Sequence, residues 1–231
     1  MIMDGKKFAS LCDVGAFSAL TTKSEVDYAI EVAKKYHPFA LFTPKCYCKY
    51  VSDALKGTGV GLEFSICSPL GHDEVETKVF GTKRYIELGL TEVETYLNLS
   101  YFKSGMYKEA FEDVLAVRKA MPDDMVLKCI IQTPVLSDEE LKLAANICVD
   151  AGVNYVKTGN ATYGPTTVHA VDVLANALQG KAQIKATTPF SSIEHIYSLL
   201  DAGATRLGIT TEEFVKLYDI VEADFKAGRQ K

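Results

Sequence analysis

The amino-acid sequence predicts a single α/β domain, residues 1–231, folded as a (β/α)8 TIM barrel. Short apolar runs alternate with longer amphipathic segments along the whole chain. The alternation occurs eight times, about once every 29 residues, and parallel strands joined by helical crossovers of one handedness close into a barrel with eight such units. An open doubly wound sheet is the competing fold, but it usually has fewer units, and its glycine-rich phosphate turn is missing here.

Eight short runs are the expected strands. Each is apolar, and each is followed by a segment with helical periodicity or by turn residues. In chain order the expected strands cover 10–15, 39–43, 61–67, 91–97, 125–133, 154–159, 182–188 and 205–210.

Amphipathic segments between these runs are the expected helices. Ser24 with Asp27 and Ser137 with Glu140 fit the capping box, in which the two side chains satisfy otherwise unpaired N–H groups at a helix start. The helical patterns cover 24–36, 75–88, 106–121, 137–151, 192–202 and 211–227.

Three helix ends share one pattern, with a glycine about three residues before the next strand. These are Gly89, Gly152 and Gly203. Glycine suits the left-handed position that directly follows a helix. The same glycine after three different helices is therefore typical of a fold that repeats one βα unit.

Charge and hydropathy exclude several classes of partner. The net charge is −5 and the pI is about 5.5, whereas binding to nucleic acid requires clustered positive charge. Neither a signal-peptide pattern nor a run of 18 apolar residues is present. We therefore expect a cytoplasmic protein that acts on a small molecule and binds neither nucleic acid nor a membrane.

Six cysteines lie scattered in apolar segments without the C-x-x-C spacing of a zinc or redox site. Cys46 and Cys48 are separated by one residue, so on a strand their side chains would point the same way, as two zinc ligands would. The two further ligands of a zinc site are missing, however. We expect free, buried thiols and no metal.

Two lysines end neighbouring expected strands. Lys157 ends the sixth and Lys185 the seventh, at the end of a TIM barrel where catalytic groups gather. A nearby cation and partial desolvation both lower the pKa of a lysine, which makes the neutral, nucleophilic amine more abundant. This is how a Schiff-base lysine is activated. The alternative is that neither lysine is catalytic, and that each buries its aliphatic chain at a strand end while its ammonium group reaches water.

Three more charged residues interrupt apolar strands. Lys128 lies in the fifth strand, Glu94 in the fourth and Asp13 in the first. Together with the two strand-end lysines they could supply a nucleophile, a pKa modulator and a proton relay. A charge-neutral internal network is the alternative, because buried ions generally pair. Lys128 fits a structural ion pair as well as a role in the site.

Seven segments spread nearly end to end along the chain share the motifs of one known family: "LCDVGAF", "DALKGTGVGLEFSICSPLG" (53–71), "ETKVFGTKRYIELGLTEVE" (76–94), "YFKSGMYKEAFEDV" (101–114), "VLKCIIQTPVLSDEE" (126–140), "AGVNYVKTG" (151–159) and "AGATRLG" (202–208). Through these segments the chain resembles the deoxyribose-phosphate aldolase family of class I aldolases. The resemblance implies that Lys157 forms the Schiff base and that Lys185 lowers its pKa. It also implies a relay carboxylate at Glu94 and a site aspartate at Asp13.

The chain departs from the family pattern in four places. Glu94 replaces an aspartate and is one methylene longer, Thr188 and Pro189 replace a Gly-Gly turn, the Gly-x-Ser-Ser segment is "GITT" (208–211), and "KTSTG" is "KTGNA". Proline has no N–H to offer a phosphate, and side chains obstruct close approach of the backbone. The substrate-binding candidates are Thr158, Asn160, Thr187, Thr188, Ser191, Thr210, Thr211 and Lys128.

These observations favour a class I aldolase, a carbon–carbon lyase that acts through a Lys157 Schiff base without metal or cofactor. We expect a small aldehyde donor such as acetaldehyde, and a sugar substrate that is unphosphorylated or otherwise altered. Two alternatives stay open: a non-catalytic barrel that binds a sugar or sugar acid, and a Schiff-base enzyme with another keto donor or another outcome. A homo-oligomer, dimer or tetramer, is also compatible with the sequence.

Overall fold

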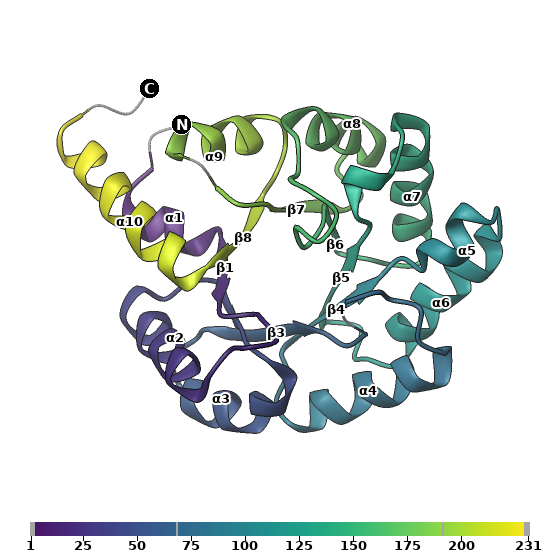
Figure 1. Cartoon of the computed structure of the whole chain (residues 1–231), viewed down its shortest axis with the longest axis horizontal. Helices are drawn as coiled ribbons and strands as arrows, with labels where there is room; N and C mark the ends of the chain where they lie inside the picture. Colours follow the sequence, from purple (N-terminus) through teal and green to yellow (C-terminus); the bar gives the residue numbers. More distant parts are fainter. Residues whose placement is uncertain (1–2, 68, 191, 229–231) are drawn as a thin grey trace.

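Eight parallel strands close into a barrel in their chain order, β1 to β8 (Figure 1). The computed structural model describes residues 3–67, 69–190 and 192–228. All eight expected strands are present, which confirms the predicted TIM barrel. They are β1 Cys12–Gly15, β2 Ala40–Phe42, β3 Gly61–Ser65, β4 Glu92–Tyr96, β5 Val126–Ile130, β6 Tyr155–Lys157, β7 Gln183–Thr187 and β8 Arg206–Thr210.

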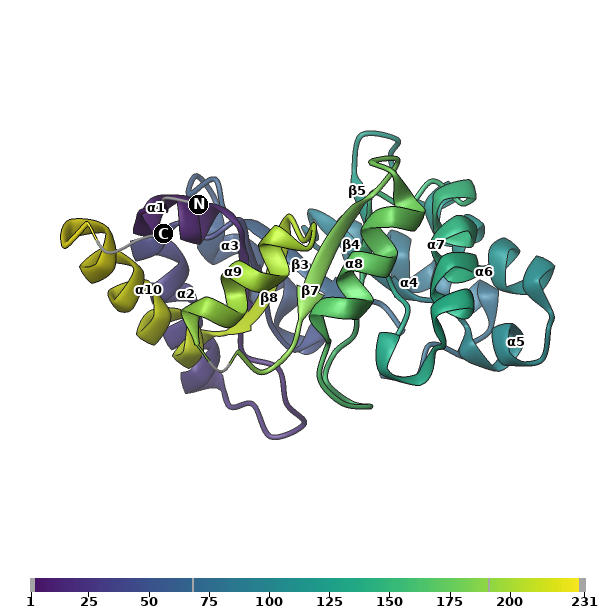
Figure 2. The same cartoon turned by 90° about the horizontal axis from the view of Figure 1, so that it is seen from above.

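Helices surround the strands on all sides, as Figures 1 and 2 show. Each of the six expected helices is found, and the structure adds α1, α3, α5 and α8. The helices are α1 Gly5–Ser10, α2 Lys23–Tyr36, α3 Cys48–Leu55, α4 Val75–Glu87, α5 Leu99–Lys103, α6 Tyr107–Lys119, α7 Asp138–Asp150, α8 Val168–Leu178, α9 Ile193–Asp201 and α10 Thr211–Lys226, with 3-10 turns at Lys45–Tyr47 and Thr133–Val135.

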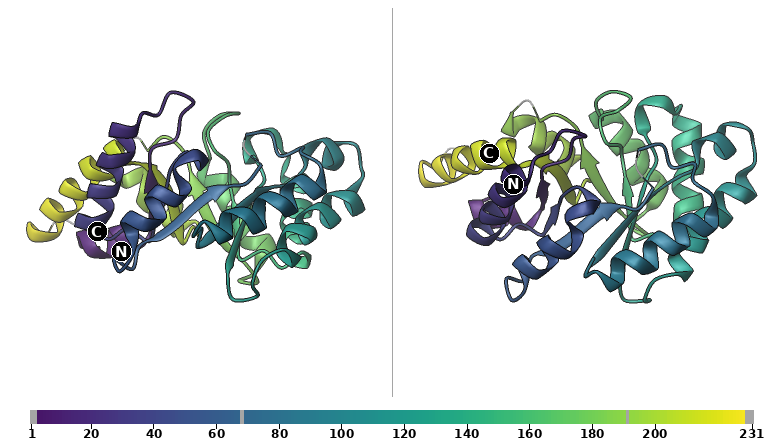
Figure 3. Two further views of the ribbon diagram at one scale, coloured as in Figure 1. Left: turned by 90° about the horizontal axis from the view of Figure 1, so that it is seen from below. Right: turned by 60° about the horizontal axis from the view of Figure 1, so that its bottom comes forward.

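The first and last helices lie side by side (Figure 3). The Gly5 amide donates to the Glu222 carboxylate at 2.7 Å, and the Phe8 ring stacks on Phe214 with centroids 5.5 Å apart. These contacts join the two ends of the described chain. None of the described helices is both long and apolar enough to cross a membrane.

One of the two predicted capping boxes is wrong. Ser137 and Glu140 form the expected box at the start of α7. At α2, however, the box is made by Thr22 and Glu25, because Thr22 has the extended backbone of an N-cap while Ser24 already lies inside the first turn. The exit glycines are confirmed, since Gly89, Gly152 and Gly203 all have positive φ.

The apolar core lies between the strands and the helices, and the barrel interior is charged. Alternate strand residues face opposite sides, so in β4 Val93 and Thr95 face outward while Glu92, Glu94 and Tyr96 face inward. All five are buried. Similar alternation in the other strands brings acidic and basic side chains together on the barrel axis. This charged interior positions the candidate site.

Candidate active site

A cavity of about 270 Å³ opens at the carboxyl ends of the strands. Its wall contains the last residue of seven of the eight strands: Phe42, Ser65, Tyr96, Ile130, Lys157, Thr187 and Thr210. In a TIM barrel this is the face that carries catalytic groups. Residues at the ends of strands, where the sequence places the catalytic candidates, therefore form much of the wall of this cavity.

Lys157 is the lysine that reaches the cavity. Its Nζ lies 2.9 Å from Oε1 and 2.8 Å from Oε2 of Glu94, and both residues line the cavity. The Lys157 side chain is 10% exposed, whereas those of Lys128 and Lys185 are 0% exposed. An incoming carbonyl compound can therefore meet Lys157 and not the two deeper lysines.

Lys185 lies beside Lys157 and beneath the cavity. The parallel ladder pairs the two residues directly, as expected for neighbouring strands. The Lys185 ammonium contacts Oε1 of Glu94 at 2.9 Å, Asp13 at 2.7 Å and the Glu63 carboxylate. Glu94 thus bridges the two lysines through a single carboxylate.

Gly208 leaves room for this arrangement. A Cβ at this position would lie 2.4 Å from Oγ1 of Thr187 and 3.1 Å from Cε of Lys185. The first contact would displace the Thr187 side chain, and the second would press on the Lys185 stem. The glycine in β8 therefore leaves room mainly for Thr187 and also for Lys185.

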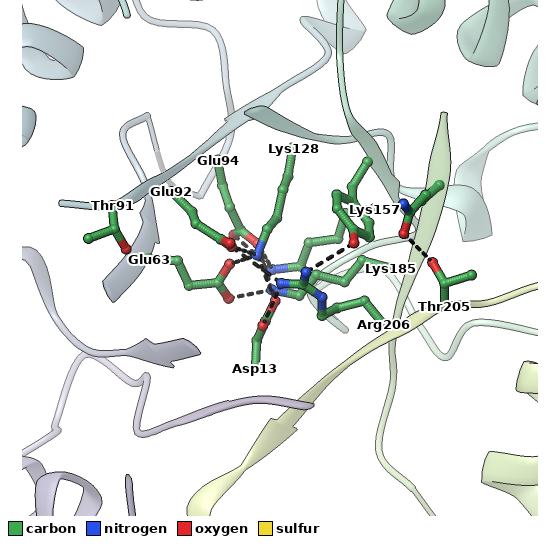
Figure 4. A network of polar contacts seen from close by, with 12 residues as sticks. Asp13, Glu63, Thr91, Glu92, Glu94, Lys128, Lys157, Lys185, Thr205 and Arg206 are labelled. Atoms are coloured by element: carbon green, nitrogen blue, oxygen red, sulfur yellow. Dashed lines mark hydrogen bonds and ion pairs between the residues drawn. The ribbon is translucent and has the colours of Figure 1, made fainter. Parts of the chain in front are cut away.

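A deeper layer of the same network holds Lys128. Its ammonium contacts Asp13 at 2.7 Å, Glu92 at 2.5 Å and also Glu63 (Figure 4). The Arg206 guanidinium contacts Asp13 at 3.1 Å and Glu92 at 3.4 Å. The network therefore contains four carboxylates and four cations: Asp13, Glu63, Glu92, Glu94, Lys128, Lys157, Lys185 and Arg206.

The centre of the acidic group is occupied by an ammonium. Oxygens of Asp13, Glu63 and Glu92 lie within 4.8 Å of one another, a spacing that a metal ion could use. Lys128 contacts all three of these carboxylates. The position that a cation would take is filled by the side chain of the protein itself.

The pKa values of the two paired lysines move in opposite directions. Burial lowers the pKa of Lys157, and the Lys185 ammonium acts in the same direction against the opposing effect of Glu94. Burial also disfavours the charged form of Lys185, but Asp13, Glu63 and Glu94 hold its pKa well above the ordinary value. Lys185 is therefore a fixed cation beside a lysine that releases its proton more easily.

Two of the three carboxylates that contact Lys185, Glu94 and Glu63, differ in pKa. Burial favours the protonated form of Glu94, but Lys157 and Lys185 lower its pKa to about 2. Burial, together with Asp13 and Glu94, raises the pKa of Glu63 to about 7. Glu94 is thus ionised near neutral pH, whereas the pKa of Glu63 lies near neutrality.

Three members of the network are absent from the sequence-based candidates: Glu63, Glu92 and Arg206. Each is a charged residue within an apolar run, which is the signal that identified Glu94 and Asp13. A search of all eight expected strands for charged residues would have identified these three as well. Asp13 itself lies below the cavity wall, where Lys128, Lys185 and Arg206 lower its pKa against the effect of burial.

Four of the substrate-binding candidates line the cavity: Asn160, Thr187, Thr188 and Thr210. The Asn160 amide donates to the Tyr96 hydroxyl at 2.9 Å and accepts from Gln132 at 2.9 Å, so its orientation is fixed.

Three other candidates lie outside the cavity wall. Lys128 belongs to the deeper network, Thr158 accepts from the Thr187 amide and from Thr166, and Thr211 is buried in the first turn of α10. Ser191 lies outside the described residues. Cys46 is also exposed, against expectation, while the other five cysteines are buried free thiols.

The relatives of this chain identify it as an aldolase-type lyase. The chain is 36% identical to a deoxyribose-phosphate aldolase of Crocosphaera subtropica over 174 residues, 74% of this chain and 77% of that protein. It is 34% identical to one from Streptococcus equi subsp. zooepidemicus over 189 residues, 81% and 86% of the two chains. The chain therefore belongs to the deoxyribose-phosphate aldolase family.

Solved structures agree with this assignment. A tetrameric deoxyribose phosphate aldolase from Aeropyrum pernix superposes with a TM-score of 0.86 at 25% identity, over 97% of this chain and 93% of the other. An aldolase designated QR15 superposes with a TM-score of 0.83 at 26% identity, over 92% and 97%. No family model matches the chain.

Proposed function

We propose that the protein is a class I aldolase that cleaves or forms a carbon–carbon bond through an imine on Lys157. One observation carries the proposal: Lys157, at the floor of the cavity, is held by Glu94, and Glu94 is held in turn by Lys185. A nucleophile and an adjacent base that is oriented by a third group form the usual arrangement of covalent catalysis. Family membership supports the same reaction class.

The imine forms in two proton-coupled steps. The neutral Lys157 amine attacks the carbonyl carbon of the substrate and gives a carbinolamine. Loss of its hydroxyl as water, with a proton supplied at the leaving oxygen, leaves the protonated imine. Glu94, within 2.9 Å of the nitrogen, takes the proton that the attacking amine loses and passes it to the carbinolamine oxygen. A second proton, from solvent, lets this hydroxyl leave as water.

Bond cleavage then uses the imine as the electron sink. A base removes the proton from the hydroxyl on the carbon beyond the scissile bond. The electrons of that bond move to the iminium carbon, so that an aldehyde departs and an enamine stays on Lys157. Protonation of the enamine carbon and hydrolysis by one water release the donor, for which we propose acetaldehyde. No metal or cofactor takes part in these steps.

We also propose an altered substrate, unphosphorylated or carrying a smaller anion than a phosphate. Thr188 and Pro189 line the cavity where the family has two glycines, so one N–H donor is lost and bulk is added. The free thiols support a location in the reducing cytoplasm. The tetrameric relative from A. pernix supports a homo-oligomer, which light scattering would test.

Borohydride trapping tests the central proposal. The protein is incubated with acetaldehyde or another small carbonyl compound, reduced with borohydride and measured by intact mass. A stable mass increase equal to the reduced adduct is expected with an aldehyde donor. A protein that gains no mass with any carbonyl compound would leave only the non-catalytic sugar-binding alternative.

A further inference from the structure

Glu213 places a carboxylate in the wall of the cavity between two loops. Its Oε2 accepts from the amide of Thr210 at 3.3 Å and from the Thr210 hydroxyl at 2.8 Å. Its Oε1 accepts from the amide of Phe190 at 3.3 Å. Thr210 ends β8 and Phe190 follows β7, so one side chain of the protein joins the two loops that follow these strands.

This carboxylate uses the donors that an anionic substrate would need. Amide groups at a helix N-terminus attract negative charge, and Thr210 is the N-cap of the 16-residue helix α10. Here the negative charge is already supplied by Glu213. A phosphate bound at this wall would find two amides occupied and would face a like charge in a partly desolvated setting, where repulsion is strong.

The remaining polar groups of the wall suit uncharged hydroxyls. Oxygens Oγ of Ser65 and Oγ1 of Thr187 and Thr188 are buried and have no hydrogen-bond partner within the described chain. Ser65 is 7% exposed and Thr188 is 4% exposed, and all three residues line the cavity. A hydroxyl both donates and accepts, and buried polar groups rarely stay unpaired. A side-chain rotation that turns one of these oxygens toward the cavity would let it pair with a hydroxyl of a polyol.

We propose that this wall binds an uncharged, hydroxylated chain, and that Glu213 is the specificity residue that excludes a phosphate. The aldehyde acceptor is then a neutral hydroxyaldehyde of the glyceraldehyde class. The inference rests on the proposed aldolase function and narrows its substrate class. Rings of Phe17, Phe42 and Phe64 complete the cavity and provide apolar contact for the carbon chain.

Synthesis assays with two acceptors test the proposal. Acetaldehyde is supplied with either glyceraldehyde or glyceraldehyde 3-phosphate, and kcat/KM for each acceptor is measured on the full chain. The unaltered protein is expected to prefer glyceraldehyde. Glu213→Gln keeps one acceptor oxygen for the capping hydrogen bonds with Thr210 and removes the charge, while its NH2 group replaces the oxygen that accepts from Phe190. It is expected to raise the phosphorylated-to-unphosphorylated ratio of kcat/KM by at least about tenfold, given the Coulomb energy at such distances.

Glu212→Gln is the matched control. Glu212 lies in the same first turn of α10, is exposed and does not line the cavity. It carries the same charge beside the same helix end. Its removal should change the ratio less than about threefold, because an exposed charge is screened by water and salt. Thermal unfolding of both variants reports any loss of helix capping.

The inference would be overturned by equal or better use of the phosphorylated acceptor by the unaltered protein, by an unchanged ratio in Glu213→Gln, or by an equal change in Glu212→Gln. Absence of product from glyceraldehyde would do so as well. Borohydride trapping of acetaldehyde alone involves no acceptor and separates the two proposals. If trapping succeeds but the ratio of kcat/KM values does not change in Glu213→Gln, only the proposed role of Glu213 is wrong. If trapping fails, the aldolase proposal itself is wrong.

Discussion

Lys157 and Lys185 lie directly opposite each other on adjacent parallel strands, and both ammonium groups contact Oε1 of the same glutamate, Glu94. Their surroundings differ, however. Lys185 is enclosed by three carboxylates, whereas Lys157 contacts Glu94 and reaches the cavity. This asymmetry is why we propose Lys157, and not Lys185, as the nucleophile.

Borohydride trapping is expected to label Lys157 alone. After reduction with acetaldehyde, peptide mapping should place the added mass on the peptide that contains Lys157, because Lys185 is inaccessible and firmly charged. Lys157→Leu should abolish both trapping and turnover. Labelling of Lys185, or trapping that survives in Lys157→Leu, contradicts the assignment.

Lys185→Leu is expected to raise the pKa of Lys157. The substitution removes a cation from beside Lys157 and frees Glu94 to pair with Lys157 alone, and both changes favour the charged amine. Since only the neutral amine attacks, the rising limb of kcat/KM against pH should move to higher pH by about one unit or more. Turnover near pH 7 should fall accordingly.

Lys103→Leu provides the comparison for this profile. Lys103 pairs with Glu140 on the surface, so its removal changes the net charge equally without touching the network. The pH–rate profile should not move. A profile that is also unchanged in Lys185→Leu would leave Lys185 a structural role only.

Glu94→Gln is expected to lower turnover by about 10²–10⁴-fold, the usual range for loss of a general acid–base group. The imine should still be trapped, because Lys157 keeps its place on β6. Glu94→Asp should retain more activity than Glu94→Gln, since it keeps the charge. Single-turnover measurements that show no effect of Glu94→Gln on proton-transfer steps would rule out the relay.

Lys128→Met is expected to destabilise the protein by about 3–5 kcal/mol, because it leaves buried carboxylates without their shared cation. Urea unfolding measures the loss. Lys142→Met, at an exposed position paired with Glu139, should change the free energy of unfolding by less than about 0.5 kcal/mol. Equal unfolding midpoints for the two variants would show that the deeper layer contributes little to stability.

Much of the fold follows from local patterns. The barrel is predicted by apolar runs that alternate with amphipathic segments and by glycines such as Gly89 and Gly152 after helices. Eight βα units whose crossovers share one handedness have few ways to pack other than a closed barrel. Lys157 ends β6 as predicted, but the prediction that Lys185 ends its strand is wrong, because Lys185 lies two residues before the end of β7. The two lysines are neighbours because the register of β6 against β7 pairs them directly. Helix starts are less well determined, because Thr22 and Ser24 are both acceptable caps and the backbone selects between them.

Which charged residues belong to the network depends on how the eight strands pack around the barrel axis. Sequence patterns point to charged residues in apolar runs one at a time, but whether Glu63 meets Lys185, or Glu92 meets Lys128, depends on register and tilt across distant strands. Glu213 is the clearest case. In the sequence it is one more acidic residue in the first turn of a helix, and only the approach of two loops turns it into a wall of the cavity.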